Sequence, residues 1–227
     1  MCFSVEADLV AGFAVGAIGI DALRHTRRPA EKALAALPVV LAGHQLTEAF
    51  VWWGLQDRVP NSVWRPALWL YLAVAFGVVP VLVPIAVGAL EPEANRRRVR
   101  AFGVIGVGVA AVLMYAVVRG PITASIDGHR IAYRVDLWHG GVIVVLYILV
   151  TTGSLLISRH VHVRWFGAAN LVAACFLAWM DQNGFISLWC IWAAITSGAI
   201  ALHLRVADRN PPPERWRHSS MTGLKPL

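Results

Sequence analysis

The sequence predicts an all-α, polytopic membrane protein with seven transmembrane helices, the N-terminus outside and the C-terminus cytoplasmic. Three observations support this fold class. The 227 residues are 58% hydrophobic and 15% charged, whereas soluble domains are about 45–50% apolar and about 25% charged. Apolar runs of roughly the 20 residues that a membrane-spanning helix needs recur along the chain. Basic residues cluster in the short segments between these runs.

The expected spans follow the apolar runs in order. They cover residues 4–24, 33–56, 62–89, 99–119, 137–157, 164–181 and 184–205. Residues 1–209 are therefore expected to form one transmembrane domain. Residues 210–227 contain consecutive prolines and polar side chains, and this composition predicts a mobile cytoplasmic tail.

A short β-hairpin is expected between the fourth and fifth spans. Residues 122–126 and 129–133 have the composition of two strands, and Asp127-Gly128 between them favours a primed turn. The hairpin would lie at the outer mouth of the bundle. Two roles stay open for it, a lid over that mouth or a plain extracellular hairpin without a role in gating.

The distribution of charge predicts the orientation. Of the 20 Lys and Arg residues, fifteen fall in the segments 24–32, 91–100, 158–164 and 205–227, and five fall on the other side. By the positive-inside rule the first side is cytoplasmic, so a multi-pass protein of the cell membrane is expected. No basic helix or stripe is free to follow phosphates, which argues against a nucleic-acid partner despite the net charge of +7. The only lysines, Lys32 and Lys225, lie outside the last span, which excludes a retinal protein with a Schiff-base lysine.

One face of the second span carries an acid at membrane depth. Helical spacing places Gln45, Glu48 and Trp52 on that face, with His44 one turn before the acid. A carboxylic acid at this depth is costly and usually functional. Glu6 and Asp8, in contrast, are interpreted as residues at a helix start, where the helix dipole favours acids.

The expected site is a dry pocket with acidic and aromatic walls. Eight of the ten tryptophans map to the outer half of the bundle, and Asp181 lies at the outer end of the sixth span. Desolvation favours the neutral form of Glu48, which could then act as a general acid, and indole faces stabilise cations. The candidate catalytic residues are Glu48 and Asp181, and the candidate substrate-binding residues are His44, Gln45, Trp52, Trp53, Trp69, Tyr115, Trp138, His139, Trp179, Ser187 and Trp189.

These residues carry two resemblances. The chain resembles small actinobacterial membrane proteins that begin Met1-Cys2-Phe3-Ser4 and carry Gln45-Leu-Thr-Glu48 and later Ser187-Leu-Trp189-Cys190. In layout it also resembles the integral-membrane terpene cyclases of fungal meroterpenoid pathways and of bacterial drimentine-type pathways. The second resemblance implies proton-initiated cyclisation of a farnesyl-type chain on a lipophilic substrate in the bilayer. It implies Glu48 as the early acid and Asp181 as the late acid, with no metal and no other cofactor.

Two other classes of function remain open. A membrane metal-dependent lipid hydrolase similar to alkaline ceramidases would use His44, His139, His203 and Asp181 as ligands, but it lacks that family's paired histidines in the last span. A proton-coupled transporter or lipid-binding protein would use Glu48 as its protonation site.

Overall fold

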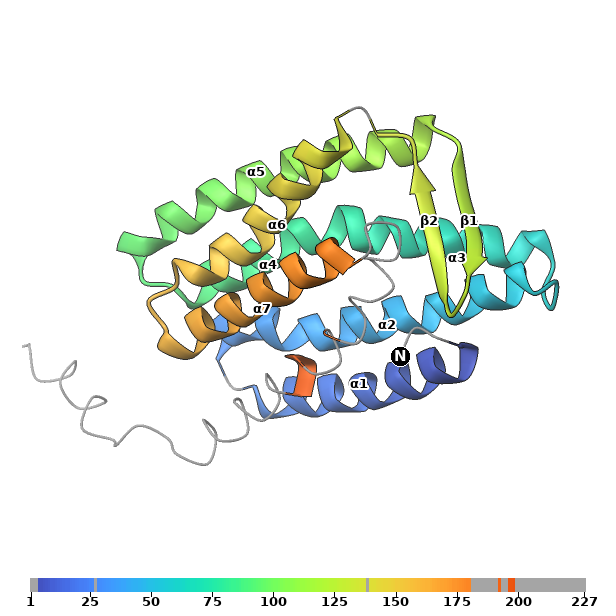
Figure 1. Cartoon of the computed structure of the whole chain (residues 1–227). Coiled ribbons are helices and arrows are strands. Elements are labelled where there is room, and N and C mark those ends of the chain that lie inside the picture. The colour runs from blue at the N-terminus through green and yellow to red at the C-terminus, as the bar shows by residue number, and fades with distance from the viewer. Residues whose placement is uncertain (1–3, 27, 138, 181–191, 193–195, 199–227) are drawn as a thin grey trace, which may run out of the picture.

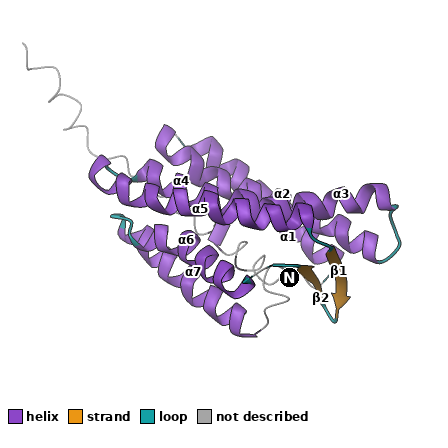
Figure 2. Cartoon of the chain, turned by 90° about the horizontal axis from the view of Figure 1, so that it is seen from above, coloured by secondary structure: helices purple, strands orange, loops and turns teal. Residues whose placement is uncertain are grey.

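The computed structural model describes residues 4–26, 28–137, 139–180, 192 and 196–198, and within these ranges the chain is mostly helical. The helices run side by side, and one β-hairpin crosses them near one end (Figure 1). The perpendicular view shows the same arrangement (Figure 2). Most of the seventh expected span and the whole expected tail lie outside the described residues.

The helices follow the first six expected spans. The helices are α1 Val5–His25, α2 Lys32–Leu55, α3 Asn61–Leu72, α4 Val79–Leu90, α5 Glu93–Arg119, α6 Gly140–Leu156 and α7 Val161–Met180. The third expected span comprises α3, a π-helical segment Ala73–Val78 and α4. Helix α5 begins at Glu93 rather than at residue 99, because arginine is a good helix former and the basic stretch continues the helix.

Within the part of the chain that the structure describes, three helices are long and apolar enough to cross a membrane. They are Pro29–Leu55, which includes a short 3₁₀ turn before α2, Asn61–Leu90 and Glu93–Arg119. Residues Gly140–Leu156 and Val161–Phe176 form shorter apolar helices. The described chain is therefore mostly helical, and its long apolar helices are consistent with a membrane protein.

Helices α1 and α2 pack closely because small residues line their contact. A Cβ added at Gly12 would lie 2.7 Å from the Leu46 side chain, and one at Gly19 would lie 2.8 Å from the backbone nitrogen of Val39. Glycines spaced in this way let two backbones approach within a membrane. As the residue number rises in α1, the facing residue number in α2 falls, so the two helices are antiparallel.

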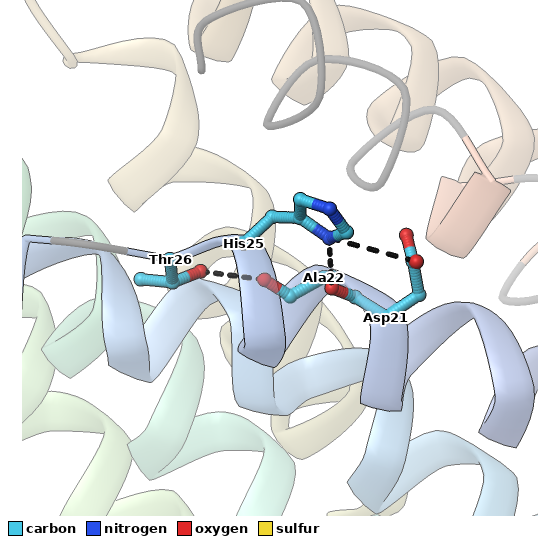
Figure 3. Close-up of polar contacts among 4 residues, drawn as sticks. All are labelled: Asp21, Ala22, His25 and Thr26. Carbon is cyan, nitrogen blue, oxygen red and sulfur yellow. Dashed lines mark hydrogen bonds and ion pairs between the residues drawn. The ribbon is translucent and has the colours of Figure 1, made fainter.

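Polar side chains complete the C-terminal end of α1 (Figure 3). The Thr26 hydroxyl donates to the Ala22 carbonyl at 2.7 Å. The His25 Nδ1 lies 2.9 Å from the Asp21 carbonyl and 3.5 Å from the Asp21 carboxylate. The last four carbonyls of a helix have no partner within the helix, and the Thr26 hydroxyl supplies one for Ala22. The polar cluster therefore ends the apolar part of α1.

Pro80 leaves one carbonyl of the π-helical segment without a partner in its own helix. The Val79 N–H donates to the Val74 carbonyl, five residues back. In this pattern the Ala75 carbonyl would need the N–H of residue 80, and proline has none. The Tyr147 hydroxyl from α6 donates to the Ala75 carbonyl instead, at 2.9 Å. A contact between two helices thus satisfies a carbonyl that the sequence leaves unpaired.

The expected β-hairpin is confirmed. Strand β1 Ile122–Asp127 pairs antiparallel with β2 Arg130–Val135. Gly128 opens the two-residue turn with a φ of 62°, and His129 has negative φ, as in the primed type II′ turn. Ile131 and Tyr133 of β2 are buried in a core that α2 and α3 also build. The hairpin therefore packs onto the helices instead of projecting away from them.

Candidate functional site

Glu48 lies at the centre of a polar cluster inside the bundle. Its side chain is fully buried, and its Oε1 accepts a hydrogen bond from the Tyr133 hydroxyl at 3.1 Å. The two residues come from helix α2 and from strand β2 of the hairpin, which crosses the helices near one end of the bundle (Figure 1). A buried carboxyl group needs such a donor because neither water nor lipid supplies one.

An aromatic stack passes from α2 through α3 to the hairpin. The Tyr71 ring stacks on the His44 ring, with centroids 3.9 Å apart and planes inclined by 21°. On its other side Tyr71 stacks on Tyr133, with centroids 4.8 Å apart and planes inclined by 25°. Because the same Tyr133 donates to Glu48, the carboxyl group and the three rings form one unit.

The other expected residues of this helix face lie in the same interior. Gln45 and Trp52 are 1% and 3% exposed, next to Glu48 on α2. Among the described residues, the Trp52 Nε1 and the His44 Nε2 have no hydrogen-bond partner. Buried donors or acceptors of this kind cost free energy unless a ligand or water pairs with them. The face therefore offers two polar atoms that a bound molecule could use.

Asp8 is a second buried acid near this level, and the interpretation given to it from sequence is incomplete. Glu6 and Asp8 do lie in the first turn of α1, and Glu6 is exposed. Asp8, however, is only 1% exposed. The register that sets Gly12 against Leu46 places Asp8 opposite residue 50, about 3 Å along the axis from the level of Glu48.

Four of the other candidate residues lie at the edge of the site or outside it. Trp53 is half-buried and meets Phe50 edge-on, with centroids 5.2 Å apart. Trp69 on α3 and Tyr115 on α5 are 41% and 63% exposed, so they face out of the bundle. His139 is exposed at the N-terminus of α6, with a φ of 55°.

The remaining candidates fall in parts of the chain beyond the described side chains. Asp181, Trp138, Ser187 and Trp189 lie outside the described residues, and only the backbone of Trp179 is described. Trp192, expected in the outer half, donates from its Nε1 to the Asn170 Oδ1 at 2.7 Å. It lines an apolar cavity of about 70 Å³ between α2, α4, α6 and α7, and Glu48 does not line this cavity.

Sequence reasoning missed the two tyrosines that complete the site. Tyr71 follows a tryptophan and a leucine in an apolar run, where an aromatic residue is unremarkable. Tyr133 belongs to the expected hairpin, and its alternation with Ile131 on β2 could have suggested that it faces inward. For the metal-dependent alternative, the described residues contain no group of three His, Cys, Asp or Glu side chains that could hold a metal ion.

The comparisons with known proteins identify one family. A model of a family of unknown function, DUF6629, matches residues 1–217. Comparison with curated proteins and with solved structures found no match, so the resemblance to terpene cyclases stays an expectation. The match extends over nearly all of the sequence, including α1 to α7 and the hairpin. The chain therefore belongs to the DUF6629 family.

Proposed function

We propose that the protein is an integral-membrane terpene cyclase in which Glu48 starts the reaction by protonating a prenyl chain on a lipophilic substrate. One observation carries the proposal. The Glu48 carboxyl group is fully buried, holds a hydrogen bond from Tyr133, and adjoins the stacked rings of Tyr71 and His44.

Each group has a role in the proposed step. The Glu48 O–H bond breaks and its proton forms a C–H bond with one alkene carbon, using the π electrons of the double bond. The other alkene carbon becomes a cation, which an aromatic face such as that of Trp52 stabilises. The Tyr133 hydroxyl stabilises the carboxylate left behind. Loss of a proton to a second carboxylate ends the reaction, so the product is an isomer of the substrate.

Two acids compete for the second role. The resemblance implies Asp181, whereas Asp8 is the buried acid that the helix register brings close to the level of Glu48. Asp8→Asn and Asp181→Asn, tested side by side, separate the two. The variant that loses the final deprotonation should release products quenched by water, which are heavier than the substrate by one water molecule.

A substrate that carries a farnesyl-type chain can reach Glu48 only if the helices move. Glu48 is fully buried and does not line the apolar cavity between α2, α4, α6 and α7, which at about 70 Å³ is itself well below the ~300 Å³ of typical ligand pockets. The π-helical segment Ala73–Val78 begins two residues after Tyr71, and π segments are frequent at functional sites. We place the opening at this segment, where the hydrogen-bond ladder of the helix is already interrupted.

We further propose seven spans in the cell membrane, with the N-terminus outside and the C-terminus cytoplasmic. The three long apolar helices and the distribution of basic residues support this arrangement. Single cysteines at Ser125 in the hairpin and at Ser219 in the tail, in a chain without its native cysteines, test it. In intact cells a membrane-impermeant maleimide should label position 125 alone.

The activity test uses membranes that contain the protein. Farnesylated indole and diketopiperazine substrates should yield new isomers of identical mass. Glu48→Gln should abolish them while insertion and folding are retained, and the exposed Glu6→Gln is the matched control. Full turnover by Glu48→Gln would refute the acid role.

A proton-coupled transporter or lipid-binding protein is the second candidate. The full burial of Glu48, with a π-helical segment that begins two residues after Tyr71 of its aromatic stack, favours it. Its test uses proteoliposomes that contain a pH-sensitive dye. Farnesylated indole added outside should change the internal pH with the wild type and not with Glu48→Gln. This outcome, together with the absence of isomers, would replace the cyclase.

A further inference from the structure

A second polar cluster ties two loops together at the end of the bundle away from the hairpin. Glu91, between α4 and α5, is 1% exposed. Its Oε2 accepts from the Asn95 Nδ2 at 2.8 Å, and its Oε1 accepts from the Ser158 hydroxyl and from the Arg159 N–H, the latter at 3.0 Å. Asn95 also donates to the Ile157 carbonyl at 3.0 Å. The start of α5 is thus held against the turn between α6 and α7.

A polar cavity of about 410 Å³ opens beside this cluster. Arg98 from α5, Arg159 from the turn and Arg164 from the first turn of α7 line it, together with Asn95 and Ser158. The arginines come from three separate segments, which the hydrogen bonds of Glu91 hold in register. Glu91 itself does not line the cavity.

The charge of this cavity is strongly positive. The three arginine side chains are exposed, and no ion pair involving them is formed with a described acidic side chain. The Glu91 carboxylate already accepts hydrogen bonds from the Ser158 hydroxyl, the Asn95 side-chain amide and the Arg159 backbone N–H. Helices α5 and α7 also begin here, and the N-terminus of a helix favours anions. Guanidinium groups match phosphate oxygens in geometry as well as charge.

We propose that this cavity binds a phosphate group, carried either by the headgroup of an anionic phospholipid or by a soluble phosphate compound. The volume of the cavity is more than a dozen times the ~30 Å³ that one water occupies. It therefore has room for a phosphate and a part of the group attached to it. It lies on the face that the count of basic residues assigns to the cytoplasm, where anionic lipids and soluble phosphates both occur. The proposal does not depend on the function of Glu48.

The test uses the full chain in detergent and two probes. Inorganic phosphate is added in one arm, and phosphatidylglycerol or phosphatidylcholine in the other, with thermal stability and native mass spectrometry as readouts. The variant is Arg98→Gln with Arg164→Gln. The matched control is Arg97→Gln with Arg100→Gln, which removes the same charge from exposed positions of α5 that do not line the cavity.

Phosphatidylglycerol should be retained in preference to phosphatidylcholine, and the cavity variant should bind it roughly 30-fold more weakly, a factor of about five for each arginine. The control variant should bind like the wild type. Stabilisation by inorganic phosphate that only the cavity variant loses would assign the site to soluble phosphates, whereas retention of phosphatidylglycerol alone assigns it to lipid. Equal losses in the two variants, or no effect of either probe on the wild type, would overturn the proposal. Arg164→Gln alone serves if the double variant does not fold.

Discussion

The hydroxyl of Tyr133 donates a hydrogen bond to the carboxyl group of Glu48 across 3.1 Å, although the two residues are 85 positions apart in the chain. One belongs to a strand and the other to a helix. The bond connects the hairpin to the only part of the described interior where an acid, a histidine and two tyrosines meet.

Removing this donor should cost stability and, under the proposed function, activity. Tyr133→Phe leaves the buried Glu48 Oε1 without this partner, and a lost partner of this kind costs about 1–3 kcal/mol. The free energy of unfolding in detergent measures the effect. Tyr115→Phe removes a hydroxyl from a side chain that is 63% exposed and should change it little. Equal effects of the two substitutions would mean that the bond does not stabilise the fold.

The Tyr147 hydroxyl should matter for a different reason. Tyr147→Phe leaves the Ala75 carbonyl in the π-helical segment without its donor, because Pro80 cannot replace it. We expect a loss of about 1–3 kcal/mol in the free energy of unfolding. Adding Pro80→Ala to the Tyr147→Phe variant should recover a part of this loss, since the alanine N–H can pair with the freed carbonyl. If stability does not recover at all, Pro80 is not the reason why the Ala75 carbonyl depends on Tyr147.

The contact between α1 and α2 should not tolerate one added methyl group. Gly19→Ala sets a Cβ 2.8 Å from the Val39 backbone, which cannot move aside as a side chain could, and overpacking of this kind costs about 1–3 kcal/mol. Gly43→Ala is the matched control within α2, because a Cβ there meets nothing within 4 Å. It should stabilise the helix by about 0.5–1 kcal/mol. Thermal unfolding in detergent compares the two variants, and a neutral Gly19→Ala would show that the helices are not in close contact there.

The Glu91 cluster should make stability depend on pH. Burial raises the pKa of the Glu91 carboxyl, but the hydrogen bonds from Ser158, Asn95 and the Arg159 backbone, with the nearby His160, outweigh burial and hold the pKa below its ordinary value of 4.5. A carboxyl group whose pKa is lower in the folded state stabilises the fold above pH 4.5, and this contribution is lost as pH falls through the folded-state pKa.

Glu91→Gln lacks this titration, so its melting temperature should lie below that of the wild type at pH 7. The difference between the two should shrink as the pH is lowered from the ordinary pKa of 4.5 through the folded-state pKa, where the carboxyl group gains its proton. Glu93→Gln, at an exposed position in the first turn of α5, should follow the wild type throughout. A difference that stays constant over this range would show that the charge of Glu91 does not stabilise the cluster.

The sequence alone predicts the helices and the hairpin because both are encoded locally. A segment that crosses a membrane must satisfy its backbone internally, so apolar length marks α2, α3 to α4, and α5. The hairpin follows from Gly128, where the turn requires a positive φ that glycine adopts at little cost. The placement of Glu48, Gln45 and His44 on one buried face follows from the period of the helix.

The sequence by itself therefore determines which segments are helical and that Glu48, the acid of α2, is buried. Only the tertiary structure places Tyr71 and Tyr133 at that acid, buries Asp8 against α2 and ties Glu91 to a turn more than 60 residues away. Hydrophobic periodicity reports which side of a helix faces inward, but it contains no information on which neighbour that side meets. That choice depends on close packing between helices and on the demand that every buried polar group find a partner, and both are properties of the folded chain as a whole.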